Sequence, residues 1–268
     1  MAEKITLESL LSMKEKKEKI TMLSVSDYYG AQLVDSLGVT CILVGDSLGK
    51  YVQGGEDALS VTTWDMYYYC RIVRKAVQNS LLIVDLPFAS YELKDPQETV
   101  EQARFLMEKG GAGAVKLEGA EEYFPVIKAL IEANIPVMGH LGLKETYSKQ
   151  TGGSLKTAKD RHKDWNWVAK NAQKLQDMGA FSLLLDCVPA VLGGEIASAL
   201  KIPVIGKGAG RGVDGQSMVF HEMMGYHEDL RAKYVKRYAR LSQVMSAAVR
   251  SYVDDIHNLR FPSEEHEI

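Results

Sequence analysis

The stretch FSLLLDC, residues 181–187, is a short apolar run with a carboxylate, Asp186, near its end. Similar short runs recur along the chain of 268 residues, and helix-like segments lie between many of them. Because the runs are mostly continuously apolar, they are typical of parallel strands covered on both faces. The other seven runs are TMLSV 21–25, VTCILV 39–44, LLIV 81–84, AVKLE 114–118, PVM 136–138, PVIG 203–206 and SMVFH 217–221.

Eight strand–helix alternations in a chain of this length match a (β/α)8 TIM barrel. The sequence therefore predicts the α/β class, with a single catalytic barrel domain over residues 1–268. A doubly wound open sheet is the alternative architecture. We expect a leading helix near 6–19, and a C-terminal helical segment that docks on a neighbouring subunit. The later helices are expected at 96–109, 121–133, 164–178 and 231–257.

The composition predicts a cytoplasmic protein. A net charge of −3 gives no reason to expect nucleic acid or an anionic membrane as partner. No apolar run reaches the roughly 18 residues of a membrane span, and the first residues lack an apolar signal core. The three cysteines, Cys41, Cys70 and Cys187, are far apart and odd in number, which favours core residues over disulfides or a zinc site.

Three carboxylates lie at the ends of neighbouring predicted strands, where barrel enzymes carry their chemistry. Asp46 and Asp85 follow the second and third runs, and Glu118 ends the fourth. Adjacent strands lie about 5 Å apart, so three acids at one level would repel one another unless a cation lay among them. Oxygen ligands that leave room for water or substrate suit Mg²⁺. The sequence therefore predicts a magnesium site here.

Other polar residues at the predicted strand ends have both functional and structural interpretations. Lys116 lies two residues before Glu118, so both side chains point the same way, as a functional pair or as a structural ion pair. Asp27 is either a supporting site residue or a helix cap. His140 is either catalytic or a satisfied histidine that supports the site. His221 is expected to be structural.

A serine hydrolase is the alternative from another enzyme class. Residues 45–49 read GDSLG, which matches the nucleophile elbow G-x-S-x-G around Ser47, and Asp254 and His257 supply a D-x-x-H pair. The elbow requires a helix directly after the serine. Residues 50–61, KYVQGGEDALSV, do not have a helical pattern, which argues against this interpretation.

Nine strings, spread in order from about residue 6 to residue 266, together resemble a known enzyme family. They are VGDSLG 44–49, VQGG 52–55, DLPF 85–88, VKLEG 115–119, GHLGL 139–143, CVP 187–189, PVIGKGAG 203–210, DGQ 214–216 and FPSEEH 261–266. The family is that of the ketopantoate hydroxymethyltransferases. The resemblance implies a barrel of the phosphoenolpyruvate mutase/isocitrate lyase type that assembles as a homo-oligomer, typically a decamer.

The resemblance also implies the reaction and the residues that perform it. The enzyme would use Mg²⁺ and 5,10-methylenetetrahydrofolate to transfer a hydroxymethyl group to a small 2-oxo acid, 3-methyl-2-oxobutanoate, in pantothenate biosynthesis. Matched position by position, Asp46, Asp85 and Glu118 correspond to metal ligands or their supporting residues. Asp46, Ser47, Asp85 and Lys116 correspond to the groups that hold the oxo acid. Lys116 would also stabilise the negative charge that develops on its oxygen.

Three features depart from the family pattern. The family's base is a glutamate where this chain has Asp186, so the expected proton acceptor is one methylene shorter. The loop after the fifth strand reads GGSLKTA, residues 152–158, in place of the usual glycine–tyrosine–lysine string. Lys207 stands where the family usually has an aliphatic residue, and it is expected to pair with an additional acidic group on the substrate.

The sequence thus predicts an enolate-forming hydroxymethyltransferase with Asp186 and Lys116 as catalytic residues. Asp27, His140 and Lys207 are expected to support the site. The departures leave a diverged aldolase or lyase of the same superfamily, acting on another 2-oxo acid, as the alternative. A barrel that binds a ligand without catalysis is the third possibility.

Overall fold

The computed structural model describes residues 4–92, 95–143, 165–227 and 232–268. Contacts between residues divide the chain into two compact units, Met1–Met218 and Val219–Ile268, and each is described by itself. The assignment of residues 1–268 to one catalytic domain stays a prediction. None of the helices in the described ranges combines the length and apolar character needed to cross a bilayer.

Eight parallel strands, hydrogen-bonded in chain order, close into a barrel. The (β/α)8 architecture predicted from the apolar runs is confirmed, and the open-sheet alternative is wrong. All eight predicted runs overlap strands. The strands are β1 Ile20–Ser24, β2 Cys41–Val44, β3 Leu81–Asp85, β4 Ala114–Glu118, β5 Val137–Gly142, β6 Ser182–Asp186, β7 Val204–Lys207 and β8 Gly215–Val219.

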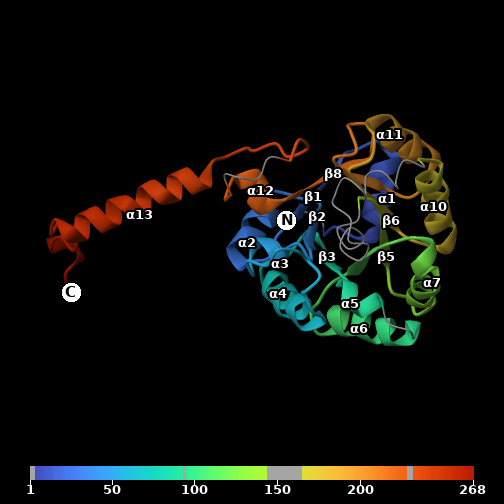
Figure 1. Cartoon of the computed structure of the whole chain (residues 1–268), viewed down its shortest axis with the longest axis horizontal. Coiled ribbons are helices and arrows are strands. Elements are labelled where there is room, and N and C mark those ends of the chain that lie inside the picture. The colour runs from blue at the N-terminus through green and yellow to red at the C-terminus, as the bar shows by residue number, and fades with distance from the viewer. Residues whose placement is uncertain (1–3, 93–94, 144–164, 228–231) are drawn as a thin grey trace. The chain divides into compact units, whose positions relative to one another are not determined.

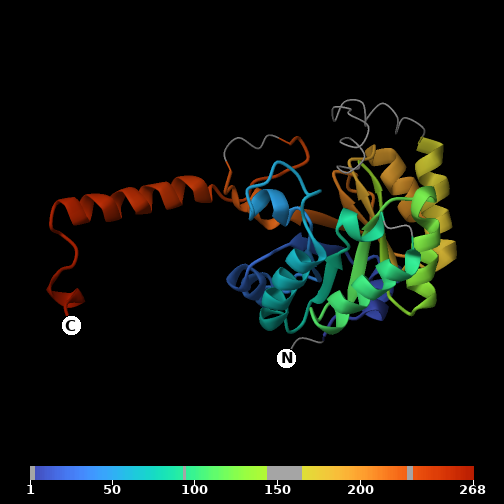
Figure 2. The same ribbon diagram turned by 60° about the horizontal axis from the view of Figure 1, so that its bottom comes forward.

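Helices lie outside the strands of the first unit, as Figure 1 shows for α2, α4, α6, α7, α10 and α11, and Figure 2 shows the same arrangement from a second direction. Helix α4 illustrates why they form. Thr62 and Asp65 make a reciprocal capping box at its start, and one face of the helix is buried. The helices are α1 Leu7–Glu15, α2 Tyr28–Ser36, α3 Leu48–Tyr51, α4 Thr63–Ala76, α5 Phe88–Tyr91, α6 Pro96–Glu108, the 3₁₀ turn η1 Glu121–Tyr123, α7 Phe124–Glu132, α10 Trp165–Met178 and α11 Ala190–Ala199.

Apolar side chains fill the amino-terminal end of the barrel. Leu10 of α1 packs into one buried cluster with side chains from seven strands, so the leading helix belongs to this end. The strand members are Ile20, Met22, Cys41, Leu43, Leu81, Ile83, Ala114, Met138, Leu184 and Ile205. Since this end holds the core, the polar side chains at the carboxyl ends of the strands are left for chemistry.

The predicted boundaries of two strands, β5 and β8, differ from the structure. The last run was expected at 217–221, but β8 begins at Gly215. A Cβ at Gly215 would lie 2.4 Å from the carbonyl oxygen of Ile20, so only glycine permits this approach to β1. The fifth strand is longer than expected, and His140 therefore lies inside β5.

The second unit contains α12 Phe220–Met224, α13 Leu241–His257 and the 3₁₀ turn η2 Glu264–His266. The prediction of a helix from residue 231 is wrong, because residues 232–240 form turns and bends. The backbone N–H of Tyr238 donates to the carbonyl of Met223, 2.8 Å away, instead of continuing a helical ladder. Helix α13 has no buried residue.

A buried carboxylate, Asp35, ties α2 to the start of β3. It accepts backbone N–H groups of Gln78 at 3.0 Å, Asn79 at 3.0 Å and Ser80 at 2.7 Å. Burial pushes the pKa of Asp35 up, but the hydrogen bonds from Ser80, Gln78 and Asn79 outweigh it and hold the pKa below its ordinary value.

We predict that Asp35→Asn lowers the free energy of unfolding by about 2 kcal/mol at pH 7, because the amide cannot accept all three N–H groups through charged oxygens. The folded pKa is depressed, so the carboxylate's contribution is full above the unfolded pKa near 3.9 and is lost as the pH falls through the folded value. Urea unfolding at several pH values checks this. Asp177→Asn, on the exposed face of α10, is the matched control. Equal midpoints for the two variants would contradict the assignment.

Candidate active site

The strand register brings six of the polar strand-end residues into three facing pairs. Asp85 of β3 lies opposite Lys116 of β4, and Glu118 of β4 lies opposite His140 of β5. Asp186 of β6 lies opposite Lys207 of β7. Side chains two apart on a strand share a face, so Lys116 and Glu118 belong to the same face of β4. The predicted site residues of β3–β7 therefore gather at one end of the barrel.

Lys116 and Asp85 form a buried ion pair. The Nζ atom lies 2.9 Å from Asp85 Oδ1, and both side chains are less than a tenth exposed. Burial alone would lower the pKa of Lys116. The carboxylates of Asp85, Asp46 and Glu118 outweigh it and raise the pKa above its ordinary value, so Lys116 is an ammonium at neutral pH.

The end of β2 lies against the same ion pair. The backbone N–H of Asp46 donates to Asp85 Oδ2 at 3.0 Å. A Cβ at Gly45 would lie 3.2 Å from Ser47 Oγ and 3.4 Å from Asp85 Oδ2, so Asp46 and Ser47 follow a backbone that passes close to Asp85. Helix α3 begins directly after Ser47 and ends at Tyr51, so the expectation that residues 50–61 are not helical is wrong for residues 50 and 51.

His140 connects the two sides of this cluster. Its Nδ1 atom lies 3.4 Å from Lys116 Nζ and 3.8 Å from Glu118 Oε2. Its Nε2 atom lies 4.0 Å from Asp186 Oδ2. The imidazole is buried, and it stands between the expected base and the expected charge-stabilising lysine.

The end of β6 is held in place by backbone contacts on both sides. Asp186 O accepts the N–H of Leu143 at 2.8 Å, and the N–H of Cys187 donates to Lys207 O at 2.7 Å. Gly142, with φ +111°, has no room for a Cβ, which would lie 2.1 Å from Asp186 O. The Asp186 side chain is buried, and its Oδ2 atom lies 3.1 Å from Lys207 Nζ.

Asp27 and His221, which the sequence analysis also named, make contacts of a different kind. Asp27 is exposed and caps α2, where it accepts the N–H of Gly30 at 2.7 Å, which is the capping alternative that the sequence left open. His221 is in α12 of the second unit, with its ring 4.8 Å from that of Tyr226. The loop 152–158 lies outside the described residues.

Sequence reasoning missed Tyr91, which lies in α5 just after the DLPF string. It is 2% exposed. Burial, followed by the charges of Glu118 and Asp46, raises the pKa of Tyr91 well above its ordinary value, so its hydroxyl stays protonated. Its ring packs edge-on against Tyr123, 4.9 Å away. Because Tyr91 lies in the short helix that follows β3 and not at a strand end, no sequence pattern indicated that it belongs among the acids.

Asp46, Asp85 and Glu118 offer carboxylate oxygens, the kind of donor that Mg²⁺ binds. Among the described residues, no group of three His, Cys, Asp or Glu side chains is arranged so that it could hold a metal ion by itself. Mg²⁺ usually binds one or two carboxylates and keeps its other positions for water and substrate oxygens. Asp46 and Asp85 meet through a backbone hydrogen bond, and both act on the charge of Lys116, as does Glu118.

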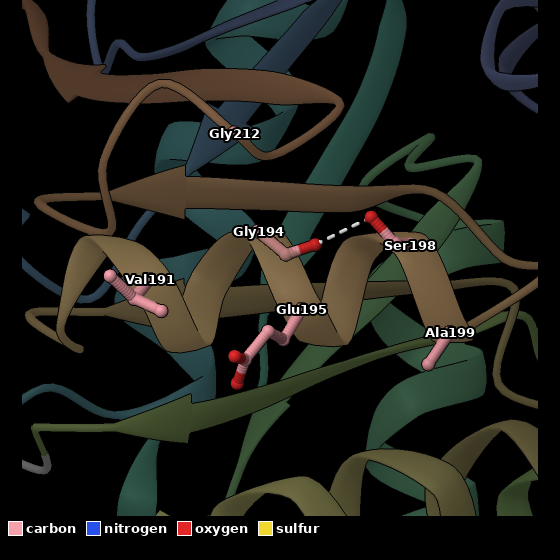
Figure 3. Close-up of a pocket in the computed structure, with 6 residues that line it drawn as sticks. All are labelled: Val191, Gly194, Glu195, Ser198, Ala199 and Gly212. Carbon is pink, nitrogen blue, oxygen red and sulfur yellow. Dashed lines mark hydrogen bonds between the residues drawn. The ribbon is translucent and has the colours of Figure 1, made fainter.

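A pocket of about 640 Å³ lies elsewhere, along the exposed side of α11. Figure 3 shows its lining residues, with Ser198 Oγ donating to Gly194 O at 2.8 Å. None of the predicted site residues lines it. The lining residues are Val191, Gly194, Glu195, Ser198, Ala199 and Gly212.

A family model described as ketopantoate hydroxymethyltransferase matches residues 4–264. The chain belongs to the ketopantoate hydroxymethyltransferase family. A 3-methyl-2-oxobutanoate hydroxymethyltransferase of Christiangramia forsetii is 42% identical over 98% of this chain and 96% of its own. A 3-methyl-2-oxobutanoate hydroxymethyltransferase of Clostridium novyi is 41% identical over 98% of this chain and 95% of its own.

Solved structures of low sequence identity share the fold. A 2,3-dimethylmalate lyase, described as a PEP mutase/isocitrate lyase superfamily member, has a TM-score of 0.60 at 15% identity, over 98% of this chain and 88% of its own. A phosphoenolpyruvate phosphomutase from Streptomyces platensis also has a TM-score of 0.60. It is 14% identical, and the match covers 98% of this chain and 91% of its own. These likenesses confirm the expected barrel fold.

Membership in the ketopantoate hydroxymethyltransferase family makes this chain a transferase and supports hydroxymethyl transfer to 3-methyl-2-oxobutanoate in pantothenate synthesis. This membership does not support the serine hydrolase alternative.

We predict that Asp85→Asn lowers the free energy of unfolding by about 3 kcal/mol, because it leaves the Lys116 ammonium buried without its ion-pair partner. Since the pKa of Lys116 is raised, its charge contributes fully below the unfolded pKa near 10.4, which includes pH 7, and this contribution is lost as the pH rises through the folded pKa. Adding Lys116→Met to Asp85→Asn should recover part of the loss in urea unfolding.

The exposed pair Lys128–Glu132, with 3.6 Å between Nζ and Oε1, is the matched control. Glu132→Gln should change stability by less than about 1 kcal/mol. Additive effects of Asp85→Asn and Lys116→Met would show that the two side chains are not coupled.

Proposed function

We propose that this protein transfers a hydroxymethyl group from 5,10-methylenetetrahydrofolate to 3-methyl-2-oxobutanoate in a Mg²⁺-dependent reaction through an enolate, which gives ketopantoate. The observation that carries the proposal is the buried arrangement of Lys116 and Asp85 facing His140 and Asp186 at the carboxyl end of the barrel. Family membership supports the acceptor and the transferred group. A cytoplasmic location suits this biosynthetic role and stays a prediction.

Asp46 and Asp85 are the residues proposed to hold Mg²⁺, with Glu118 beside them. When bound, the ion supplies a Lewis acid that polarises the carboxylate and ketone oxygens of the 2-oxo acid. The ammonium of Lys116, 2.9 Å from Asp85, is proposed to stabilise negative charge on the same ketone oxygen. Ser47, which follows Asp46, is proposed to hold the oxo acid with these groups.

Asp186 is the proposed base. Its carboxylate takes the proton from C3 of the oxo acid, and the electron pair of the broken C–H bond passes into the enolate. Water breaks both carbon–nitrogen bonds of the methylene bridge, which releases tetrahydrofolate and leaves the one-carbon unit as formaldehyde. C3 then bonds to this carbon as its C=O double bond becomes a single bond, and the oxygen takes the proton held by Asp186 to become the hydroxyl group. His140, whose Nε2 atom lies 4.0 Å from Asp186 Oδ2, is placed to support the carboxylate.

An aldolase or lyase of the same superfamily, acting on another 2-oxo acid, is the second candidate. The pairing of Asp186 with Lys207 favours it, because both residues depart from the family pattern. Both candidates require an enolate at the same cluster, and they differ in whether a folate is needed to complete the reaction.

Helix α13 supports the proposal of a homo-oligomer. Several of its apolar side chains are exposed within this chain, which is unusual for a soluble helix that has no partner. They include Val244, Met245, Val249, Tyr252 and Val253. The decamer that the family resemblance implies stays a prediction.

Deuterium exchange tests the enolate step without the folate. The protein with 3-methyl-2-oxobutanoate and Mg²⁺ in deuterated water should exchange the C3 hydrogen, followed by proton NMR, and ketopantoate should form only when 5,10-methylenetetrahydrofolate is added. Asp186→Asn should slow exchange by about 100-fold or more, because the amide cannot accept the proton. Asp177→Asn is the control. No exchange by the native protein with any of several 2-oxo acids would overturn both enolate candidates and favour a binding protein.

Metal removal tests the proposed magnesium ligands. We expect EDTA to abolish exchange and added Mg²⁺ to restore it. In calorimetric titration with 3-methyl-2-oxobutanoate present, Asp46→Asn should weaken Mg²⁺ binding by at least about 10-fold, as loss of a supporting residue already does at other metal sites. The exposed-site variant Glu132→Gln should bind like the native protein. Exchange that persists in EDTA would contradict a metal-dependent enolate.

A further inference from the structure

Lys207, at the end of β7, lies opposite Asp186 at the end of β6. Its Nζ atom donates to Asp186 Oδ2 at 3.1 Å, and the Asp186 side chain is 9% exposed. We propose that Lys207 is a positioning residue for Asp186, which fixes the orientation of the carboxylate and so decides which oxygen meets the substrate. This inference rests on the proposed function, in which Asp186 takes the proton from C3.

The two oxygens of Asp186 have different surroundings. Oδ2 faces Lys207 Nζ at 3.1 Å and His140 Nε2 at 4.0 Å. Oδ1 is buried and makes no hydrogen bond within the described part of the chain. A buried carboxylate oxygen without a donor is costly in free energy, and such an atom is expected where a ligand supplies the missing contact. Oδ1 is therefore the oxygen assigned to the C3 proton.

An aspartate carboxylate needs a fixed hydrogen-bond donor to define its orientation. The distribution of its terminal torsion angle is broad and roughly two-fold, so the side chain alone does not set it. Without a fixed donor on one side, this torsion does not define which of the two oxygens faces the substrate. A charged hydrogen bond is about twice as strong as a neutral one, so the ammonium restrains this rotation effectively. The backbone around both residues is fixed as well, since the Cys187 N–H donates to the carbonyl of Lys207 at 2.7 Å.

The positional requirement on a base explains why the restraint matters for rate. An error of about 1 Å in the position of a reacting group can cost about 100-fold. The carboxylate of Asp186 is carried by one methylene fewer than a glutamate carboxylate. It therefore has one torsion fewer with which to adjust to the substrate, and its orientation must come from a neighbouring side chain.

The alternative role for Lys207 is to bind a second acidic group on the substrate. The positive charge of Lys207 in the sequence predicts this role. The two roles differ in a measurable way. A positioning residue acts through Asp186, so it changes kcat and loses its effect when Asp186 is removed. A substrate-binding residue changes KM for a diacid whether or not Asp186 is present.

The experiment is C3 hydrogen–deuterium exchange of 3-methyl-2-oxobutanoate by the full-length protein with Mg²⁺, measured for Lys207→Met, Lys207→Arg, Asp186→Asn and the double variant Asp186→Asn/Lys207→Met. Lys207→Met should lower kcat for exchange by about 10- to 100-fold, with KM changed less than about threefold. Lys207→Arg, which keeps the charge, should recover most of the rate. In the Asp186→Asn background, Lys207→Met should have no further effect.

Lys201→Met, an exposed lysine just before the other end of the same strand, is the matched control and should exchange at the native rate. Circular dichroism melting checks that each variant is folded, and Lys207→Gln replaces Lys207→Met if the latter does not fold. A native rate for folded Lys207→Met overturns the inference. So does a rise in KM for a 2-oxo diacid such as 2-oxoglutarate that persists in the Asp186→Asn background.

Failure of the proposed function has a different signature. Native protein that does not exchange, or Asp186→Asn that exchanges at the native rate, removes Asp186 as the base and the inference with it. Exchange by the native protein that is lost in Asp186→Asn but unchanged in Lys207→Met leaves the proposed function in place and overturns the positioning role alone.

Discussion

The buried ammonium of Lys116 is the constraint on which the carboxyl end of the barrel depends. A lysine charge inside a protein is tolerated only when carboxylates surround it, and here Asp85 lies 2.9 Å away while Asp46 and Glu118 add to the same field. The acids in turn need the cation, since three carboxylates on neighbouring strands would otherwise repel one another. The acids and the ammonium thus stabilise each other, and the same charges are the ones that an enolate reaction requires.

The parallel pairing of the strands places further polar and charged side chains opposite one another from β3 to β7. Because the strand-end residues meet in register, the Asp85–Lys116 pair is followed by Glu118 opposite His140 and then by Asp186 opposite Lys207. His140 lies within 4.0 Å of charged groups on both sides, so it joins the cluster built by β3 and β4 to the one built by β6 and β7. The opposite end of the barrel, filled with apolar side chains, holds these strand ends at fixed separation.

The periodic features of the sequence were sufficient to predict the barrel. All eight apolar runs overlap strands, and in strands such as β2, β3 and β6 every residue is buried, which leaves a continuous apolar pattern. The features that were missed depend on contacts between distant segments. The start of β8 is set by the close approach of Gly215 to Ile20, and residues 232–240 leave the helical pattern because Tyr238 bonds to Met223. Tyr91 joins the acids only through packing of α5.

Asp186 and Lys207 show most clearly what sequence reasoning lacked. Each was recognised separately as a departure from the family pattern, and Lys207 was assigned to the substrate. The register of β6 and β7 places the two side chains 3.1 Å apart, so the two departures form a single ion pair. A buried ion pair contributes little net stability, because desolvation of both charges offsets most of their attraction. Its physical effect is mainly orientational, and the group that it orients is the carboxylate that faces the site.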